Sequence, residues 1–392
     1  MRIAYVVPRY GLEVVGGAEL GARMLAERLV ANLGWQVEVL TTCAQDASTW
    51  ADEYPPGEEL VNGVLVRRFS SQAGRDPGFE EFSQRLLRHP EGVSSADQER
   101  WVELQGPVCP ELLDTLAETP ADVAAFYPYL YHPTVAGIGR QKGRAVMHPA
   151  AHDEPPLRLP LFRDVFEAAD GLVFQTWGER RLVESRFPVA HAPAVVVGLG
   201  VEPTDGEPGP ARDLLGVGDR PYLCCLGRVD DGKGAGLLAA FFAAFKRRHP
   251  GPLALVFVGP VVHRPPPHPD IFVVGAVDEA TKWGALRGAL ALVSPSPLEA
   301  FSLVLVEGWQ AGLPALVNAR CAATVEHCRR SGGGLWFSSY ATFEATIGRL
   351  VSSTTLRARL ARAGAHYVEQ RFSWPAVIDR YSSFLTEVAQ RP

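Results

Sequence analysis

Several features that define particular classes of protein are missing from this sequence. No apolar run approaches the roughly 18–20 residues of a membrane-spanning helix. The six cysteines include no C-x-x-C pair, so we expect reduced thiols and interpret Cys224 and Cys225 as small core residues. The net charge is −6 at pH 7 and the pI is about 6.0, which excludes the broad basic footprint of a nucleic-acid-binding protein.

The N-terminus also lacks a targeting signal. Residues 1–7, MRIAYVV, enter an expected strand directly, with neither the long apolar core nor the cleavage site of a signal peptide. We therefore expect a cytoplasmic protein. The pairs Arg247-Arg248 and Arg329-Arg330 are interpreted as solvated surface, with weak peripheral contact at the inner membrane face as the alternative.

What is present indicates a globular α/β protein. The 392 residues are 47% hydrophobic and 21% charged, and a chain of this length has room for two full cores. Short apolar runs alternate with helix-length amphipathic segments, which predicts parallel sheets. Asn62-Gly63 predicts a hairpin, and 71–121, poor in strand signals, predicts helices. The expected strands span residues 3–7, 37–41, 123–127, 145–147, 172–174, 194–197, 222–226, 253–258, 271–274, 290–293 and 315–317.

A change in composition divides the chain. Residues 203–219 contain several Pro, Gly and Asp residues and are interpreted as a linker. We expect one domain over residues 1–200 and a second over residues 201–373. The last segment, residues 374–392, is expected to be a terminal helix.

Residues 294–314, SPSPLEAFSLVLVEGWQAGLP, combine a strand end, a tight loop and a helix. Pro295 and Pro297 predict an extended turn. The apolar run 301–309, closed by Gly312, predicts the helix. A ligand above the strand end would face the unpaired N–H groups at the helix start, which bind anions and phosphate above all.

Two carboxylates, Glu299 and Glu307, belong to this unit. If both were helical, the rise of about 1.5 Å per residue would separate them by roughly 12 Å. That is too far for the acid and base of a glycosidase, which lie roughly 5–10 Å apart, but it suits groups at opposite ends of a sugar nucleotide. The alternative is an exposed helix glutamate and a carboxylate near a positive helix end.

Residues 227–234, GRVDDGKG, follow an apolar strand and precede an amphipathic helix. The segment is one residue short of a phosphate-binding P-loop, and Gly234 stands where a Ser or Thr would hold magnesium. This argues against a nucleotide triphosphatase, although a phosphotransferase stays open as a minor alternative. Arg228 offers a planar fork and Lys233 a point charge, both suited to phosphate oxygens. A solvated basic turn is the alternative.

Together these segments resemble the motifs of the family 4 glycosyltransferases, retaining enzymes of the two-domain GT-B fold. The E-x7-E pattern falls on Glu299 and Glu307, and G-R-x4-K-G falls on residues 227–234. Residues 16–19, GGAE, match another segment of the family. The usual E-G-F-G-L appears as EAFSL at residues 299–303, so both glycines are replaced, which stiffens a loop expected to approach the ligand.

The resemblance implies two facing Rossmann-like domains with a cleft between them and a C-terminal helix that crosses back onto the first domain. It implies transfer of a hexose, with retention, from a UDP- or GDP-linked sugar to a hydroxyl acceptor such as a glycan, a lipid-linked sugar or a small metabolite. Glu299 would approach the donor sugar and Glu307 the ribose hydroxyls. The residues expected to bind the donor are Gly16, Gly17, Arg228, Lys233, Glu299, Ala300, Phe301, Ser302, Leu303 and Glu307.

A histidine completes the expected site. Residues 148–155, HPAAHDEP, follow an expected strand, at the end where open α/β sheets bind ligands. The family has a His at such a strand end that hydrogen-bonds the transferred sugar, and a subset carries H-D-E-P, which His152 matches. His148 is the competing candidate. A metal site formed with Asp153 and Glu154, or a satisfied loop histidine, are the alternatives.

The sequence contains no D-x-D triplet, which transferases that bind the donor diphosphate through a metal commonly use. Charge neutralisation is therefore assigned to Arg228, Lys233 and helix starts, and we expect metal-independent chemistry without a cofactor. The expected catalytic residues are His152, Glu299, Arg228 and Lys233. Two alternatives to a transferase stay open: a GT-B nucleotide-sugar epimerase, and a catalytically silent GT-B homologue that serves as a binding partner in glycan assembly.

Overall fold

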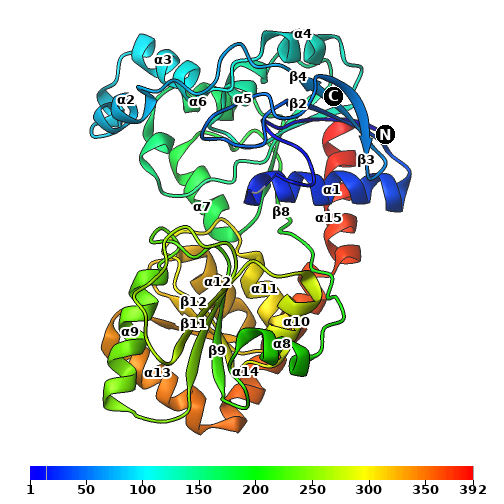
Figure 1. Cartoon of the computed structure of the whole chain (residues 1–392). Coiled ribbons are helices and arrows are strands. Elements are labelled where there is room, and N and C mark those ends of the chain that lie inside the picture. The colour runs from blue at the N-terminus through cyan, green and yellow to red at the C-terminus, as the bar shows by residue number, and fades with distance from the viewer. Residues whose placement is uncertain (15, 392) are drawn as a thin grey trace. The chain divides into compact units, whose positions relative to one another are not determined.

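The computed structural model describes residues 1–14 and 16–391 and divides into two compact units (Figure 1). The N-terminal unit consists of Met1–Gly198 together with Ile378–Pro392, and the second unit of Leu199–Val377. The expected terminal helix is present as α15 (Trp374–Ala389), which starts in the second unit and ends in the first. None of the helices in the described ranges is both long enough and apolar enough to cross a membrane.

The N-terminal unit is built on an eight-stranded sheet in the order β3-β4-β2-β1-β5-β6-β7-β8. Strands β3 and β4 pair antiparallel and the other neighbours pair parallel. The predicted hairpin is confirmed, because Asn62 and Gly63 have φ values of 50° and 84°, as a type I′ turn requires. The strands are β1 (Arg2–Val6), β2 (Gln36–Thr42), β3 (Gly57–Val61), β4 (Val64–Phe69), β5 (Val123–Phe126), β6 (Arg144–Met147), β7 (Gly171–Phe174) and β8 (Ala194–Val196).

Helices connect these strands, and residues 71–121 are largely helical, as predicted. In Figure 1, α2 and α3 lie beside each other at one margin of the unit, in agreement with their mutual contacts. Besides α15, the helices of this unit are α1 (Gly17–Leu33), α2 (Phe79–Leu86), α3 (Ser95–Gln105), α4 (Pro110–Glu118), α5 (His132–Gly137), α6 (Phe162–Glu167) and α7 (Trp177–Arg186), with short 3-10 turns η1 (Pro90–Gly92) and η2 (Pro155–Arg158).

The second unit has a six-stranded parallel sheet in the order β11-β10-β9-β12-β13-β14. Strand β10 is buried at all five positions, as expected for a parallel strand covered by helices on both faces. Its strands are β9 (Tyr222–Leu226), β10 (Ala254–Val258), β11 (Ile271–Gly275), β12 (Ala291–Ser294), β13 (Ala315–Asn318) and β14 (Gly334–Phe337). Its helices are α8 (Pro208–Leu215), α9 (Ala235–Arg248), α10 (Glu279–Arg287), α11 (Leu303–Gln310), α12 (Ala322–Ser331), α13 (Tyr340–Ser352) and α14 (Thr354–Phe372).

One expectation about the chain between the sheets was wrong. Residues 203–219 are not a continuous linker, because they contain helix α8. Pro208 occupies the first position of this helix, where its missing N–H is harmless, and Gly216 follows the last position with a φ of 70°. The Pro and Gly residues that suggested a linker are the start and stop signals of a short helix.

In each unit the strand order reverses beside the first strand, between β1 and β5 and between β9 and β12. Open α/β sheets bind ligands outside the carboxyl ends of their strands at such a switch point. In the second unit the two loops that leave this point are residues 227–234, after β9, and residues 295–302, after β12. They are the two motif segments that the sequence analysis selected.

Candidate active site

Asp230 shapes the first of these loops. Its Oδ1 accepts the backbone N–H of Lys233 at 2.6 Å, and its Oδ2 accepts a hydrogen bond from Nε of Arg228. Burial acts to raise the pKa of Asp230, but these hydrogen bonds and the two cations outweigh it, so the pKa is lowered. Asp230 is buried, and it holds Arg228 at its Nε while 55% of the Arg228 side chain stays exposed.

Gly234 brings the two loops together. It has a φ of 78°, and a Cβ atom built there would lie 2.6 Å from the carbonyl oxygen of Pro295 in the second loop. The side chain of Asn318, at the end of β13, donates a hydrogen bond to the same carbonyl at 2.9 Å. A Ser or Thr of a P-loop therefore has no room at position 234, which explains the departure from that motif.

Lys233 and Glu299 form an ion pair across the two loops. The distance from Lys233 Nζ to Glu299 Oε1 is 2.7 Å, and both side chains are partly exposed. Glu299 is not at the entrance of the helix as expected, because α11 begins four residues later, at Leu303. The helical rise therefore does not set the separation between Glu299 and Glu307, and that part of the spacing argument was wrong.

The segment that links Glu299 to α11 turns through a left-handed residue. Ser302, in place of the second family glycine, has φ 72° and ψ 74°, whereas Ala300 is not among the residues with positive φ in the described chain. The ring of Phe301 is buried, 5.2 Å from the His327 ring and 5.0 Å from the Phe372 ring. A ligand at this loop would therefore meet the backbone of residues 300–303 and not the Phe301 ring.

Glu307 lies on α11 and pairs with Lys282 on α10. Lys282 Nζ is 2.9 Å from Glu307 Oε1 and 2.8 Å from Glu279 Oε1. Burial by itself would lower the pKa of Lys282, but the two carboxylates outweigh burial and raise it. Lys282 thus stays charged and binds one carboxylate oxygen of Glu307.

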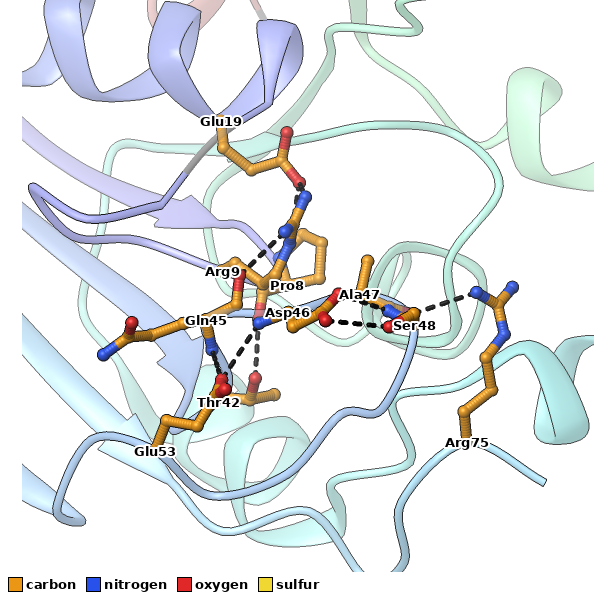
Figure 2. A network of polar contacts seen from close by, with 10 residues as sticks. All are labelled: Pro8, Arg9, Glu19, Thr42, Gln45, Asp46, Ala47, Ser48, Glu53 and Arg75. Atoms are coloured by element: carbon orange, nitrogen blue, oxygen red, sulfur yellow. Dashed lines mark hydrogen bonds and ion pairs between the residues drawn. The ribbon is translucent and has the colours of Figure 1, made fainter. Parts of the chain in front are cut away.

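In the N-terminal unit, the expected glycines lie at the start of α1. A Cβ at Gly16 would be 2.2 Å from Oε2 of Glu19, whereas a Cβ at Gly17 would meet nothing within 4 Å. Glu19 is buried against Arg9, whose Nε donates to Glu19 Oε1 at 3.0 Å and whose Nη1 donates to the Gln45 carbonyl at 2.8 Å. Figure 2 shows Arg9 between these two partners, so Glu19 has a structural partner, and a side chain at Gly16 would displace the end of that ion pair.

The structure separates the two histidine candidates. His148 is buried, stacks on Tyr127 with ring centroids 3.9 Å apart, and has its Nε2 3.0 Å from the Tyr381 hydroxyl. Burial lowers the pKa of His148 well below its usual range, so it is a neutral core residue. His152 is partly exposed, although its Nδ1 is a buried atom without a hydrogen-bond partner among residues 1–14 and 16–391. Of the two histidines, His152 is therefore the one whose side chain solvent or a ligand can reach.

Around His152 the loop carries two more carboxylates. Glu154 Oε1 accepts the Tyr129 hydroxyl at 3.0 Å, and burial raises the pKa of Glu154. Asp153 is exposed and forms an ion pair with Arg158 at 3.0 Å. In the part of the chain that the structure describes, no three His, Cys, Asp or Glu side chains converge as metal ligands.

Comparison of the sequence with known proteins relates this chain to a family. A family model described as glycosyl transferases group 1 matches residues 212–367. A D-inositol 3-phosphate glycosyltransferase of Acidothermus cellulolyticus is 30% identical over 422 residues, which cover 93% of this chain and 84% of that protein. The chain belongs to the group 1 glycosyltransferases.

Solved structures support the fold of this glycosyltransferase. A sucrose-phosphate synthase from Thermosynechococcus elongatus superposes with a TM-score of 0.71 at 18% identity, over 99% of this chain and 98% of that one. A structure described as trehalose-6-phosphate from E. coli bound with UDP-2-fluoro glucose has a TM-score of 0.74 at 13% identity, over 100% of both chains. The predicted GT-B class of α/β fold is confirmed.

Sequence reasoning missed two residues around the candidate site of this glycosyltransferase, Asp230 in the loop after β9 and Lys282 on α10. Asp230 lies in the motif of residues 227–234, but the sequence led to no predicted role for it. An Asp three residues before Lys233 is nevertheless a typical signal for a side chain that caps a turn. Lys282 carried no signal, because its partner Glu307 is 25 residues away on another helix. The structure brings Lys233 to Glu299 and Lys282 to Glu307, while Gly16 and His152 belong to loops of the N-terminal unit.

Proposed function

We propose that this glycosyltransferase is a retaining, metal-independent enzyme of family 4 that transfers a hexose from a UDP- or GDP-linked sugar to a hydroxyl acceptor. The observation that carries the proposal is the Lys233–Glu299 ion pair, which joins the two loops at the switch point of the second sheet. It places a cation suited to a diphosphate within 2.7 Å of a carboxylate suited to a sugar.

The roles follow the charges of the site. Arg228 and Lys233 bind the donor diphosphate, with the backbone N–H groups of residues 300–303 adding donors at the start of α11. Glu299 accepts from a sugar hydroxyl, and Glu307 accepts from the ribose hydroxyls. In the N-terminal unit, His152 hydrogen-bonds the transferred sugar and Gly16-Gly17 offers backbone N–H groups to phosphate.

Catalysis in this proposal is electrostatic. As the bond between the sugar C1 and the phosphate oxygen breaks, negative charge grows on the diphosphate, and Arg228 and Lys233 stabilise it without a metal ion. The acceptor oxygen forms its bond to C1 on the same face, and its proton passes to the leaving phosphate oxygen. The anomeric configuration is therefore retained.

The acceptor is proposed only by class. The relative from Acidothermus cellulolyticus is described as acting on D-inositol 3-phosphate, and one structural neighbour is described as bound to UDP-2-fluoro glucose. These descriptions support a UDP-linked donor and an acceptor hydroxyl on a small metabolite, a glycan or a lipid-linked sugar. We place the enzyme in the cytoplasm, with weak contact at the inner membrane face as a further part of the proposal.

A thermal-shift screen against UDP-, GDP-, ADP- and dTDP-sugars, with and without EDTA, tests the donor site. A ligand at about 100 times its Kd stabilises the folded state by about 2.7 kcal/mol, so we expect a clear rise in Tm with one nucleotide. EDTA should not change this rise, and Arg228→Ala or Glu307→Ala should abolish it. Arg247→Ala, which removes an exposed cation at the end of α9, is the control and should preserve it.

Product analysis tests the reaction. We expect nucleotide release only when acceptor is present, and an NMR spectrum of the product with the donor's anomeric configuration. Absence of any nucleotide-sugar shift would refute the donor site and favour a silent homologue. Conversion of the nucleotide sugar without acceptor would indicate an epimerase. Loss of the shift with EDTA would refute metal independence, and an inverted product would refute retention.

A further inference from the structure

A buried carboxylate that has no role in the proposed chemistry joins two loops of the N-terminal sheet. Glu179 lies on α7 and is 4% exposed. Its Oε1 accepts the N–H of Ala151, in the loop after β6, at 2.9 Å. Its Oε2 accepts the N–H of Gln175, in the loop after β7, at 2.7 Å. One side chain thus binds the backbone at the carboxyl ends of two neighbouring strands.

Helix capping alone does not explain this arrangement. Thr176 is the N-cap of α7, and its hydroxyl accepts the N–H of Glu179 at 3.1 Å. In a capping box, the glutamate at this third helical position bonds back to the N–H of the N-cap residue itself. Glu179 also interacts with the backbone N–H of the N-cap residue Thr176, but its two oxygens reach further, to Gln175 one residue back and to Ala151 in a separate loop. The second bond holds that other loop.

The loop that Glu179 reaches contains an unfavourable backbone conformation. Ala150 has a φ of 52°, which lies in the left-handed region that residues with a Cβ atom seldom adopt. Such a conformation persists only where neighbouring contacts determine it. The N–H directly after this residue is the one that Glu179 accepts.

His152 is the next residue along the loop, and the anchors lie on both sides of it. Before it, the Pro149 carbonyl accepts the Tyr129 N–H at 3.2 Å. After it, Glu154 accepts the Tyr129 hydroxyl at 3.0 Å. Between these anchors, the Glu179 side chain accepts the N–H of Ala151 and so contacts the turn at residues 150–151. Burial raises the pKa of Glu179 to about 7, and the backbone N–H groups around it act in the opposite direction.

We propose that Glu179 is a positioning residue that holds the left-handed turn at Ala150 and thereby sets the direction of the His152 ring. The inference rests on the proposed function in one respect, the assignment of His152 to the transferred sugar. Glu179 itself is buried and does not touch the substrate.

The perturbing variant is Glu179→Gln, and Glu184→Gln is its matched control. Glutamine has one acceptor and one donor group, so one of the two backbone N–H groups would face an NH2 group. Glu184 lies on the same helix, where it is partly exposed and pairs with Arg180 at 2.7 Å. Glu179→Asp, which keeps the charge but shortens the side chain, provides a second variant if Glu179→Gln does not fold.

The first readout does not need enzymatic activity. Amide hydrogen exchange of a peptide that covers residues 149–154 should become about tenfold faster at Ala151 in Glu179→Gln, because the amide opens without its acceptor. Exchange in Glu184→Gln should equal that of the unsubstituted protein. Unchanged exchange at Ala151 in the folded Glu179 variant would overturn the proposal.

The second readout is the transfer reaction. We expect kcat to fall about tenfold in Glu179→Gln, with the KM for the nucleotide sugar within about twofold, because a displaced catalytic group mainly affects the chemical step. In a His152→Ala background, Glu179→Gln should reduce kcat no further, since residues that act through one another are not additive. An undiminished further loss in that background would overturn the proposal. If the unsubstituted protein transfers no sugar, the proposed function fails, and the exchange measurement still decides whether Glu179 holds the turn.

Discussion

Ser302 offers a direct test of the strained loop in front of α11. Its φ of 72° and ψ of 74° are left-handed, and its side chain makes no capping hydrogen bond to the helix among the described residues. A left-handed conformation costs a residue with a Cβ atom roughly 1–2 kcal/mol. Ser302→Gly removes that cost, but glycine raises the conformational entropy of the unfolded chain and so stabilises the unfolded state by about 0.4–1 kcal/mol. The difference predicts a net stabilisation of about 0.5–1 kcal/mol.

Both proteins are unfolded in urea with tryptophan fluorescence as the readout, and their thermal unfolding is measured in a second experiment. A stabilisation of about 1 kcal/mol corresponds to a rise of roughly 2–4 °C in Tm for a domain of this size. The same substitution at another N-cap of the second unit is the control. Ser339 has a φ of −154° and a capping box with Thr342, so Ser339→Gly should destabilise by a few tenths of a kcal/mol. If Ser302→Gly is neutral or destabilising while Ser339→Gly behaves as expected, the strain argument is refuted.

Two further predictions concern the interior of the second unit. Burial lowers the pKa of His327 to about 4, below its usual value of about 6.5. Between these two pH values the folded protein therefore binds fewer protons than the unfolded chain. The free energy of unfolding falls as the pH drops through this window, by up to roughly 3 kcal/mol. His327→Gln should flatten the dependence of the free energy of unfolding on pH, as measured by denaturation at several pH values. Substitution of the exposed His366 should leave that dependence unchanged. An unchanged dependence in His327→Gln would contradict the role given to His327. A Cβ at Gly364 would lie 2.2 Å from Cδ1 of the buried Trp309 indole, so Gly364→Ala should lower the free energy of unfolding by about 1–3 kcal/mol. At Gly348 on α13 an added Cβ atom would meet nothing within 4 Å, so Gly348→Ala should instead raise the free energy of unfolding by about 0.5–1 kcal/mol. Equal effects of the two substitutions in urea denaturation would refute the packing argument.

Most elements of both sheets could be predicted from the sequence, because each depends on neighbours along the chain. An apolar run such as residues 222–226 forms a buried strand wherever helices cover it, and it appears as β9. Asn62-Gly63 adopts the two positive φ values of its turn, and Gly312, with a φ of 83°, follows the end of α11 as predicted. Turn chemistry and side-chain periodicity act over a few residues, so they are visible without a structure.

The start of α11 could not be predicted in this way. The apolar run from Phe301 onwards suggested that the helix begins near Glu299, but the Phe301 ring packs against His327 and Phe372. These partners come from α12 and α14, far along the chain. Burial of the ring between them accompanies the left-handed turn at Ser302 and leaves Glu299 in the loop, next to Lys233.

The sequence by itself predicted which residues would carry the chemistry of the proposed site. Arg228, Lys233, Glu299 and Glu307 stand in motifs whose charges suit a sugar nucleotide, and the strand patterns place Arg228 and Lys233 in a loop at a strand end. These conclusions required only residue type, spacing and short-range periodicity. The resemblance to family 4 ranked His152 above His148, but it provided no physical reason to separate the two.

Only the tertiary structure decided which of these groups are available and what holds them. His148 and His152 share one short segment, but His148 is buried against Tyr381, 233 positions later in the chain, whereas His152 is partly exposed. Glu179 likewise reaches Ala151 only because β6 and β7 are neighbours in the sheet. Burial and partner choice depend on segments that folding brings together from distant parts of the chain, and these contacts set the charge and direction of each side chain.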